Sequence, residues 1–167
     1  MSRQTSRRLS KRMTPRRFVG DRMRMPDVNI LIYSHRADEA VHEPYKAWLE
    51  QALAGAEPLA LSVLAAVGFV RIVTNARIYS NPTPLGTALA AIEAVAAHPN
   101  CRVVGTDASH LKRFVEVSRA ANAAGKLVAD AQHAALAIAT GATWITRDAD
   151  FKRFEAAGLR WQHLLLG

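Results

Sequence analysis

Short apolar runs alternate with helical patterns along this chain from Pro26 onward, and that alternation limits the fold more than any other feature. Apolar side chains at helical spacing predict helices at 39–54, 62–73, 85–97, 107–123 and 129–140. Short apolar runs between them predict strands at 59–61, 101–104, 142–146 and 159–161. Strands separated by helices indicate an α/β fold in which helices flank a central, mainly parallel sheet.

Several boundary residues sharpen this pattern. Ser62 and Asp107 are each placed to cap the start of a predicted helix, and Gly141 is placed to end one. The run Val28–Tyr33 is compatible with either a strand or a helix, because a short apolar run has no decisive period.

The formal charge of +8 belongs to one end of the chain. Residues 1–24 carry nine Lys or Arg and one Asp, whereas residues 25–167 carry 13 bases and 13 acids. We therefore expect a disordered basic tail at 1–24 and one domain at 25–167. Two interpretations of the tail stay open. It is either a basic arm that binds RNA or DNA phosphates, or a segment upstream of a true start at Met23 or Met25.

Cys101 is the only cysteine among 167 residues, which excludes an intramolecular disulfide framework and a cysteine-based zinc cluster. No apolar run approaches the ~20 residues that a membrane span needs. The first 24 residues are too polar and too rich in arginine for a secretory signal. We therefore expect a cytoplasmic protein with no membrane partner.

Four aspartates lie at strand ends or helix starts. Asp27 adjoins the first structured segment, and Asp130 opens a predicted helix. Asp148 and Asp150 follow the strand at 142–146. Because ligands gather at the carboxyl ends of parallel strands, we expect these acids to face one crevice. Taken singly, each could be an ordinary helix cap or turn former.

A cluster of carboxylates favours a bound cation, because like charges held close together raise each other's pKa. Mg²⁺ prefers oxygen ligands and keeps several waters, so a few carboxylates can anchor it. Such an ion lowers the pKa of an attacking water and offsets charge on a phosphodiester under attack. The acids therefore indicate metal-dependent hydrolysis of phosphodiester bonds.

Three segments resemble motifs of PIN-domain ribonucleases, and most closely those of the VapC-type toxins of bacterial toxin–antitoxin pairs. They are Asp27–Tyr33, Leu127–Ala137 and Thr143–Phe151, and they occur in the order that the family shows. The resemblance runs from about residue 26 to about residue 163. It implies a PIN-like α/β/α sandwich in which the segment after Asp27 begins a helix.

The resemblance also implies a function. It implies a Mg²⁺-dependent endoribonuclease, with Mn²⁺ as a substitute, that cleaves structured RNA such as tRNA or rRNA. A cognate VapB-type antitoxin and a homodimer are expected as well. The residues carried over by position are the metal-binding acids Asp27, Asp130 and Asp148, a fourth catalytic acid, Asp150, and the supporting residues Asn29 and Thr146.

The chain departs from the family pattern at Gly68, where many PIN nucleases carry a glutamate. No acid lies between Glu57 and Glu93, so we expect weaker metal binding. Arg147 adjoins the predicted site, and its guanidinium suits a phosphate; Arg71 and Arg77 are weaker candidates for that role.

His133 lies one helical turn from Asp130, from where it could approach a substrate. Two other functions stay open. One is a catalytically weak PIN-fold module that binds RNA or a protein partner, which the missing glutamate and the basic tail would suit. The other is an aspartyl-nucleophile phosphatase, which needs a second aspartate two residues after the first as general acid. Asn29 holds that position and has no titratable proton, which disfavours the phosphatase.

Overall fold

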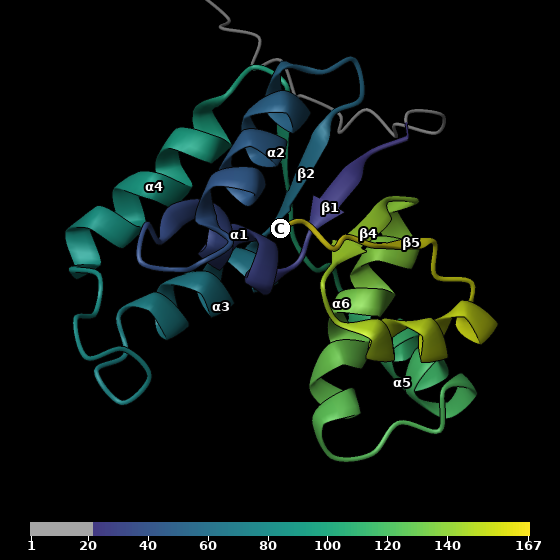
Figure 1. Cartoon of the computed structure of the whole chain (residues 1–167). Helices are drawn as coiled ribbons and strands as arrows, with labels where there is room; N and C mark the ends of the chain where they lie inside the picture. The colour runs from purple at the N-terminus through teal and green to yellow at the C-terminus, as the bar shows by residue number, and fades with distance from the viewer. Residues whose placement is uncertain (1–21) are drawn as a thin grey trace, which may run out of the picture.

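The computed structural model describes residues 22–167. Most of the predicted basic tail lies outside this range, although the first strand already begins at Arg24, the last residue assigned to that tail. The elements, shown in Figure 1, follow in this order: β1 (Arg24–Pro26), α1 (Val28–His35), α2 (His42–Ala54), β2 (Leu59–Ser62), α3 (Val63–Val73), α4 (Leu85–Ala97), β3 (Cys101–Val104), α5 (His110–Ala120), α6 (Lys126–Thr140), β4 (Thr143–Thr146), the 3-10 helix η1 (Ala149–Ala157) and β5 (Trp161–His163).

The strands within residues 22–167 form one parallel sheet in the order β3-β2-β1-β4-β5. β1 is central: Arg24 pairs with Leu59 of β2 on one side, and Pro26 pairs with Ile145 of β4 on the other. The chain therefore leaves β1 toward one edge of the sheet and returns to its other side at β4. Ligands of open α/β sheets bind at such a reversal, outside the carboxyl ends of the strands.

Helices cover both faces of this sheet, as the motifs implied for an α/β/α sandwich (Figure 1). The helices α1 to α4 pack together on one face, and α5, α6 and η1 pack together on the other. Side chains of β2 alternate accordingly: Leu59 and Leu61 join the core beneath α3 and α4, whereas Ala60 joins the core beneath α6. No helix within 22–167 is long and apolar enough to cross a membrane.

The helix α6 presents small side chains to the sheet. Ala131, Ala134 and Ala135 are fully buried, and they pack in the same core as Trp144 and Met25. Alanines at helical spacing let a helix lie close to its neighbours, since no long side chain separates the backbones. The close packing of α6 brings its first two turns to the carboxyl end of the sheet, where they line the same cavity as the end of β1.

Several boundaries differ from the sequence predictions. The helix predicted at 39–54 begins only at His42, and the helix predicted at 107–123 spans only His110–Ala120. α6 begins at Lys126, so the prediction that Asp130 opens the helix is wrong and Asp130 lies in the second turn. Gly125 has φ 56°, which lets the chain enter the helix a turn earlier. β5 begins later than predicted, because the Leu159 N–H donates to the Phe154 carbonyl at 3.1 Å and closes η1.

Of the three residues predicted to begin or end a helix, two do so and one does not. Ser62 caps α3 as expected, since its Oγ accepts from the Ala65 N–H at 3.3 Å, and Gly141 ends α6 in the left-handed conformation. The prediction that Asp107 caps α5 is wrong. Asp107 accepts from the Ser109 N–H at 2.9 Å and forms a turn that precedes the helix.

Candidate active site

Asp27 and Thr146 meet where two neighbouring strands end. The Asp27 N–H donates to the Ile145 carbonyl at 2.8 Å and extends the β1–β4 pairing one residue past β1. The Thr146 hydroxyl donates to Asp27 Oδ2 at 2.5 Å. The register of the sheet therefore sets a carboxylate from one strand end against a hydroxyl from the next.

Asp27 is also the N-cap of α1. The Val28 N–H donates to Asp27 Oδ1 at 2.6 Å, so the segment that begins at Val28 is a helix, as the resemblance implied. Asn29 Nδ2 donates to Asp27 Oδ2 at 3.0 Å, and Asn29 Oδ1 accepts from the Arg147 N–H at 3.3 Å. Asn29 thus joins α1 to the turn after β4 and orients the Asp27 carboxylate.

Burial makes the Asp27 carboxyl less acidic than usual. The residue is 7% exposed, and burial raises its pKa from 3.8 to about 6, against the hydrogen bonds from Thr146 and Val28. The charges of Asp130 and Asp148 raise the pKa further, since they have the same sign. The ionised form of Asp27 is therefore costly near neutral pH unless a cation lies beside it.

Asp148 follows β4 and caps η1. Its N–H donates to Thr146 Oγ1 at 3.0 Å, and its Oδ1 accepts from the Asp150 N–H at 2.9 Å. Its Oδ2 accepts from Lys126 Nζ at 2.5 Å, and the same ammonium lies 3.5 Å from Asp150 Oδ2. Burial raises the pKa of Asp148, but the hydrogen bonds from Lys126 and Asp150 outweigh it and hold that pKa below 3.8.

Asp130 is the least supported of the three acids. It is half-buried on α6, and its Oδ2 is buried without a hydrogen-bond partner among the described atoms. Burial raises its pKa, Lys126 opposes that change, and the charges of Asp148 and Asp150 add to it. A buried carboxylate oxygen without a donor is costly, so this atom is available to a cation.

One cavity joins these acids. It has a volume of about 630 Å³ and lies at the carboxyl end of the sheet. Its polar wall includes Asp27, Asn29, Lys126, Asp130 and Asp148, and its opposite wall is the apolar face of α3. The three acids that the resemblance assigns to the metal thus line one cavity.

The other predicted residues lie outside the cavity or at its margin. Asp150 and Thr146 do not line it, although each is bonded to an acid that does. The Arg147 guanidinium lies 5.3 Å from the centre of the Tyr33 ring, and Arg147 reaches the site only through its N–H.

Among the weaker candidates, Arg71 and His133 line the cavity, whereas Arg77 does not. The His133 ring lies 5.3 Å from the Trp144 ring, and burial lowers the His133 pKa to about 4. This histidine is therefore neutral at physiological pH and carries no charge into the cavity.

Gly68 of α3 lies close to Val28 of α1. A Cβ at this position would lie 2.9 Å from Val28 Cγ2, closer than side-chain carbons approach. A glutamate here would displace Val28, which directly follows the Asp27 cap. Val28 of α1 thus occupies the space that the side chain of a glutamate at position 68 would need.

The donor chemistry of the cavity suits a hard divalent cation, because three carboxylates line it: Asp27 directly after β1, Asp130 on α6 and Asp148 in the turn after β4. Asp130 Oδ2 is without a partner, and Asp148 Oδ2 already holds a cationic group. Within residues 22–167, however, no three His, Cys, Asp or Glu side chains are gathered closely enough to form a ready-made metal site. Lys126 was missed by the sequence analysis, although its place one turn before Asp130 puts both on one helix face.

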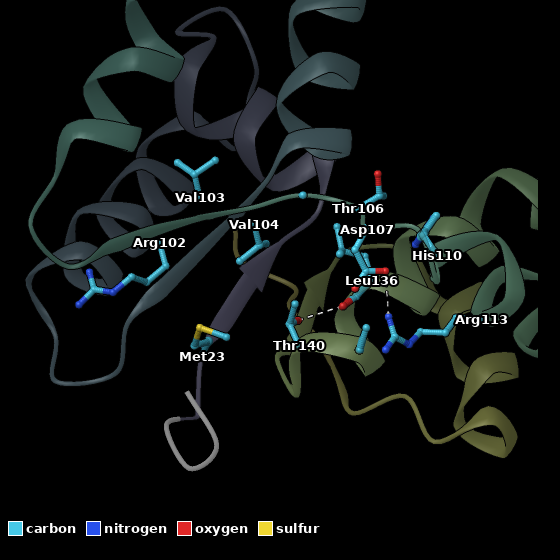
Figure 2. A pocket seen from close by; sticks show the side chains of 12 residues that line it. Met23, Arg102, Val103, Val104, Thr106, Asp107, His110, Arg113, Leu136 and Thr140 are labelled. Carbon is cyan, nitrogen blue, oxygen red and sulfur yellow. Dashed lines mark hydrogen bonds and ion pairs between the residues drawn. The ribbon is translucent and has the colours of Figure 1, made fainter. Parts of the chain in front are cut away.

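A second hollow lies beside β3 and has no comparable chemistry. Figure 2 shows this space, of about 540 Å³, between β3 and the ends of α5 and α6. Asp107 is the carboxylate among its lining residues, and Arg113 lies 3.4 Å from it. Thr140 Oγ1 donates to the Leu136 carbonyl within its own helix. The acidic cavity at the strand ends is therefore the candidate active site.

The fold and this cavity define a class of protein. A family model described as PIN domain matches residues 24–157. Ribonuclease VapC43 of Mycobacterium tuberculosis is 38% identical over 141 residues, which cover 84% of this chain and 95% of VapC43. The chain therefore belongs to the PIN-domain family and, within it, to the VapC ribonucleases.

Solved structures support the same fold. VapBC2 from Rickettsia felis, bound to a DNA fragment from their promoter, gives a TM-score of 0.62 at 18% identity and covers 84% of this chain and 97% of that one. VapC20 of M. tuberculosis, described as a sarcin–ricin loop cleaving toxin, gives 0.59 at 17% identity and covers 84% of this chain and 98% of that one.

Proposed function

We propose that this protein is a metal-dependent endoribonuclease toxin that hydrolyses phosphodiester bonds in structured RNA. The observation that carries the proposal is that Asp27, Asp130 and Asp148, from three separate segments, line one cavity at the carboxyl ends of the strands. The raised pKa of Asp27 and the unpartnered oxygen of Asp130 support a cation between them. Membership of the VapC ribonucleases supports the reaction.

Asp27, Asp130 and Asp148 would hold the ion, which we propose to be Mg²⁺ with Mn²⁺ as a substitute, because both prefer carboxylate oxygens. When bound, such an ion makes an attacking water more acidic and offsets charge on the phosphate. Asp150 is the fourth acid: its N–H orients Asp148, and its exposed carboxylate, 3.5 Å from Lys126 Nζ, would accept a proton.

The protein's own contacts set the positions of these acids. The Thr146 hydroxyl donates to Asp27 Oδ2 and accepts from the Asp148 N–H, so one side chain places two acids. Asn29 Nδ2 donates a second hydrogen bond to the same Asp27 oxygen, Oδ2. Apolar side chains of α3 line the cavity as well, and Arg71 on that helix is the guanidinium best placed for an RNA phosphate.

We propose the substrate class and the partners of this protein by analogy with two solved relatives. VapC20 cleaves the sarcin–ricin loop, and tRNA and rRNA are the structured RNAs that we propose for this chain. The R. felis structure contains a VapB–VapC pair, and we propose that a cognate VapB-type antitoxin inhibits this protein. We also propose that the toxin is a homodimer. Exposed apolar side chains beside the cavity, including Val67 at 63% exposure, are available for a protein partner.

RNA cleavage with and without chelator tests the proposal. Purified protein is incubated with tRNA, rRNA and an isolated sarcin–ricin loop RNA, in Mg²⁺ or Mn²⁺, with EDTA as the control. We expect cleavage that EDTA abolishes and Asp148→Ala removes, while Asp107→Ala, which alters an acid outside the candidate site, leaves it intact. Cleavage that survives EDTA would contradict the proposal.

A second candidate is a catalytically weak PIN module that binds RNA or a protein. Two observations favour it: α3 carries no acid in the cavity, and the acids of the described chain are not gathered into a ready metal site. RNA binding without cleavage at any metal concentration would support this module. The phosphatase has no such support, because Asn29 donates an amide hydrogen bond to Asp27 and cannot serve as a general acid.

A further inference from the structure

A lysine outside the family motifs enters the acidic cavity. Lys126 is the first residue of α6 and lies one turn before Asp130. Its Nζ is 2.5 Å from Asp148 Oδ2 and 3.5 Å from Asp150 Oδ2. The side chain lines the cavity together with the three proposed metal ligands, so a positive charge is already present where the carboxylates need one.

We propose that Lys126 is a built-in counter-ion of the active site, which holds Asp148 in the metal-free protein and is displaced when a divalent ion binds. The lysine therefore sets how much metal the enzyme requires. This inference rests on the proposed function, because it assumes that Asp148 is a metal ligand.

The contacts of Asp148 explain why displacement is required. Its Oδ1 accepts from the Asp150 N–H at 2.9 Å, and its Oδ2 accepts from the Lys126 ammonium. A divalent ion on Oδ2 would stand only a few ångströms from that ammonium, and two positive charges at such a distance repel each other strongly.

The exposure of Lys126 explains why displacement is possible. Its side chain is 64% exposed and ends in a flexible four-carbon stem, so it can turn into solvent without moving the backbone. Exposed ion pairs contribute little net stability. Lys126 is therefore a weak competitor that tunes the site, and its removal should change metal affinity by about two- to fivefold.

A purely structural role for this ion pair would have a different signature. If Lys126 only joined α6 to the turn after β4, its removal would change the stability of the protein and leave metal affinity unaltered or lower. Metal affinity measured without RNA separates the two roles, because it reports the cavity alone.

The experiment measures Mn²⁺ binding to the full chain by electron paramagnetic resonance of the free ion. Lys126→Gln should bind Mn²⁺ about two- to fivefold more tightly than the natural sequence, and Lys126→Arg should retain the weaker binding. Lys112→Gln is the matched control, since it breaks another exposed pair, with Glu116 at 4.0 Å, outside the cavity. In an Asp148→Asn background, Lys126→Gln should have no effect.

The outcomes separate this inference from the proposed function. If the natural chain binds Mn²⁺ in a manner that Asp130→Asn abolishes, but Lys126→Gln binds no more tightly, the counter-ion role is wrong and the metal site stands. If neither the natural chain nor Lys126→Gln binds Mn²⁺, both are wrong. Equal gains from Lys126→Gln and Lys112→Gln would also overturn the inference, because they would reflect net charge alone.

Discussion

The candidate site has two halves that are built differently. The inner group, Asp27, Asn29 and Thr146, lies at the ends of two paired strands, and its polar atoms bond to one another. The outer group, Asp130 and Asp148, stands on a helix and a turn, with one carboxylate oxygen unpartnered and another paired with an exposed lysine. Strand register and a helix cap thus fix the side-chain positions of the inner group without a metal ion. The carboxylates of the outer group, in contrast, need a cation to balance their charge.

The largest effect is expected from the inner half. Asp27→Asn removes a negative charge and replaces one acceptor oxygen by an NH2 group. That group faces the Val28 N–H on one side of the side chain, or the Asn29 amide and Thr146 hydroxyl on the other, so RNA cleavage at saturating Mn²⁺ should fall by about 10²- to 10³-fold. Initial rates on one RNA measure this. Asp107→Asn is the control, because that acid lines the hollow beside β3. A loss of less than about tenfold would show that the inner half is dispensable.

The raised pKa of Asp27 predicts an unusual dependence of stability on pH. Because its pKa is about 6 in the fold and 3.8 in the unfolded chain, the folded state holds the proton more tightly. This group's contribution to stability is full below pH 4 and is lost as pH rises to about 6, a change of about 3 kcal/mol.

His133 has the opposite dependence, since its lowered pKa reduces stability as pH falls through the range from 6.5 to about 4. The measurement is therefore a difference: urea unfolding of the natural chain and of Asp27→Asn, in EDTA, from pH 4 to pH 7.5. Between pH 4 and pH 7.5 the free energy of unfolding of the natural chain should fall by about 2 to 3 kcal/mol relative to that of Asp27→Asn. Parallel curves would mean that Asp27 is not a costly buried charge.

Thr146→Val tests the link between the halves. Valine keeps the shape but loses the hydroxyl that donates to Asp27 and accepts from Asp148. Loss of such a supporting bond should weaken Mn²⁺ affinity or activity by about 10- to 100-fold. Calorimetric Mn²⁺ titration without RNA checks it, with Thr140→Val as control, because Thr140 bonds only within its own helix. Unchanged affinity would mean that the two halves act separately.

The smallest effect is expected from a substitution of Gly68 on α3, which lines the same cavity as Asp27 and Asp130. Gly68→Ala should lower the free energy of unfolding by about 1 kcal/mol, because overpacking against Val28 outweighs the better helix propensity of alanine. In a Val28→Ala background the same change should stabilise by about 1 kcal/mol. Urea unfolding measures both. The same sign in both backgrounds would contradict the close contact.

The two halves also differ in how far the sequence predicts them. Asp27, Asn29 and Thr146 are expected near one another because the resemblance to family motifs assigns them to one site, and in the structure their side chains are bonded to one another. The sequence predicts a helix start near Asp130 because Gly125, with its φ of 56°, and the extra turn that follows it leave no periodic signal. The Lys126–Asp148 pair spans 22 residues and the Gly68–Val28 contact joins two helices, so both depend on packing that no local pattern records.

A crystal structure of the full chain soaked with Mn²⁺, with anomalous scattering at the manganese edge, would show whether Asp27, Asp130 and Asp148 share a metal ion. We expect one or more Mn²⁺ peaks in the cavity, at about 2.0–2.2 Å from carboxylate oxygens of Asp27, Asp130 and Asp148. A saturated crystal with no peak in this cavity, or with Mn²⁺ bound only elsewhere, would contradict the account.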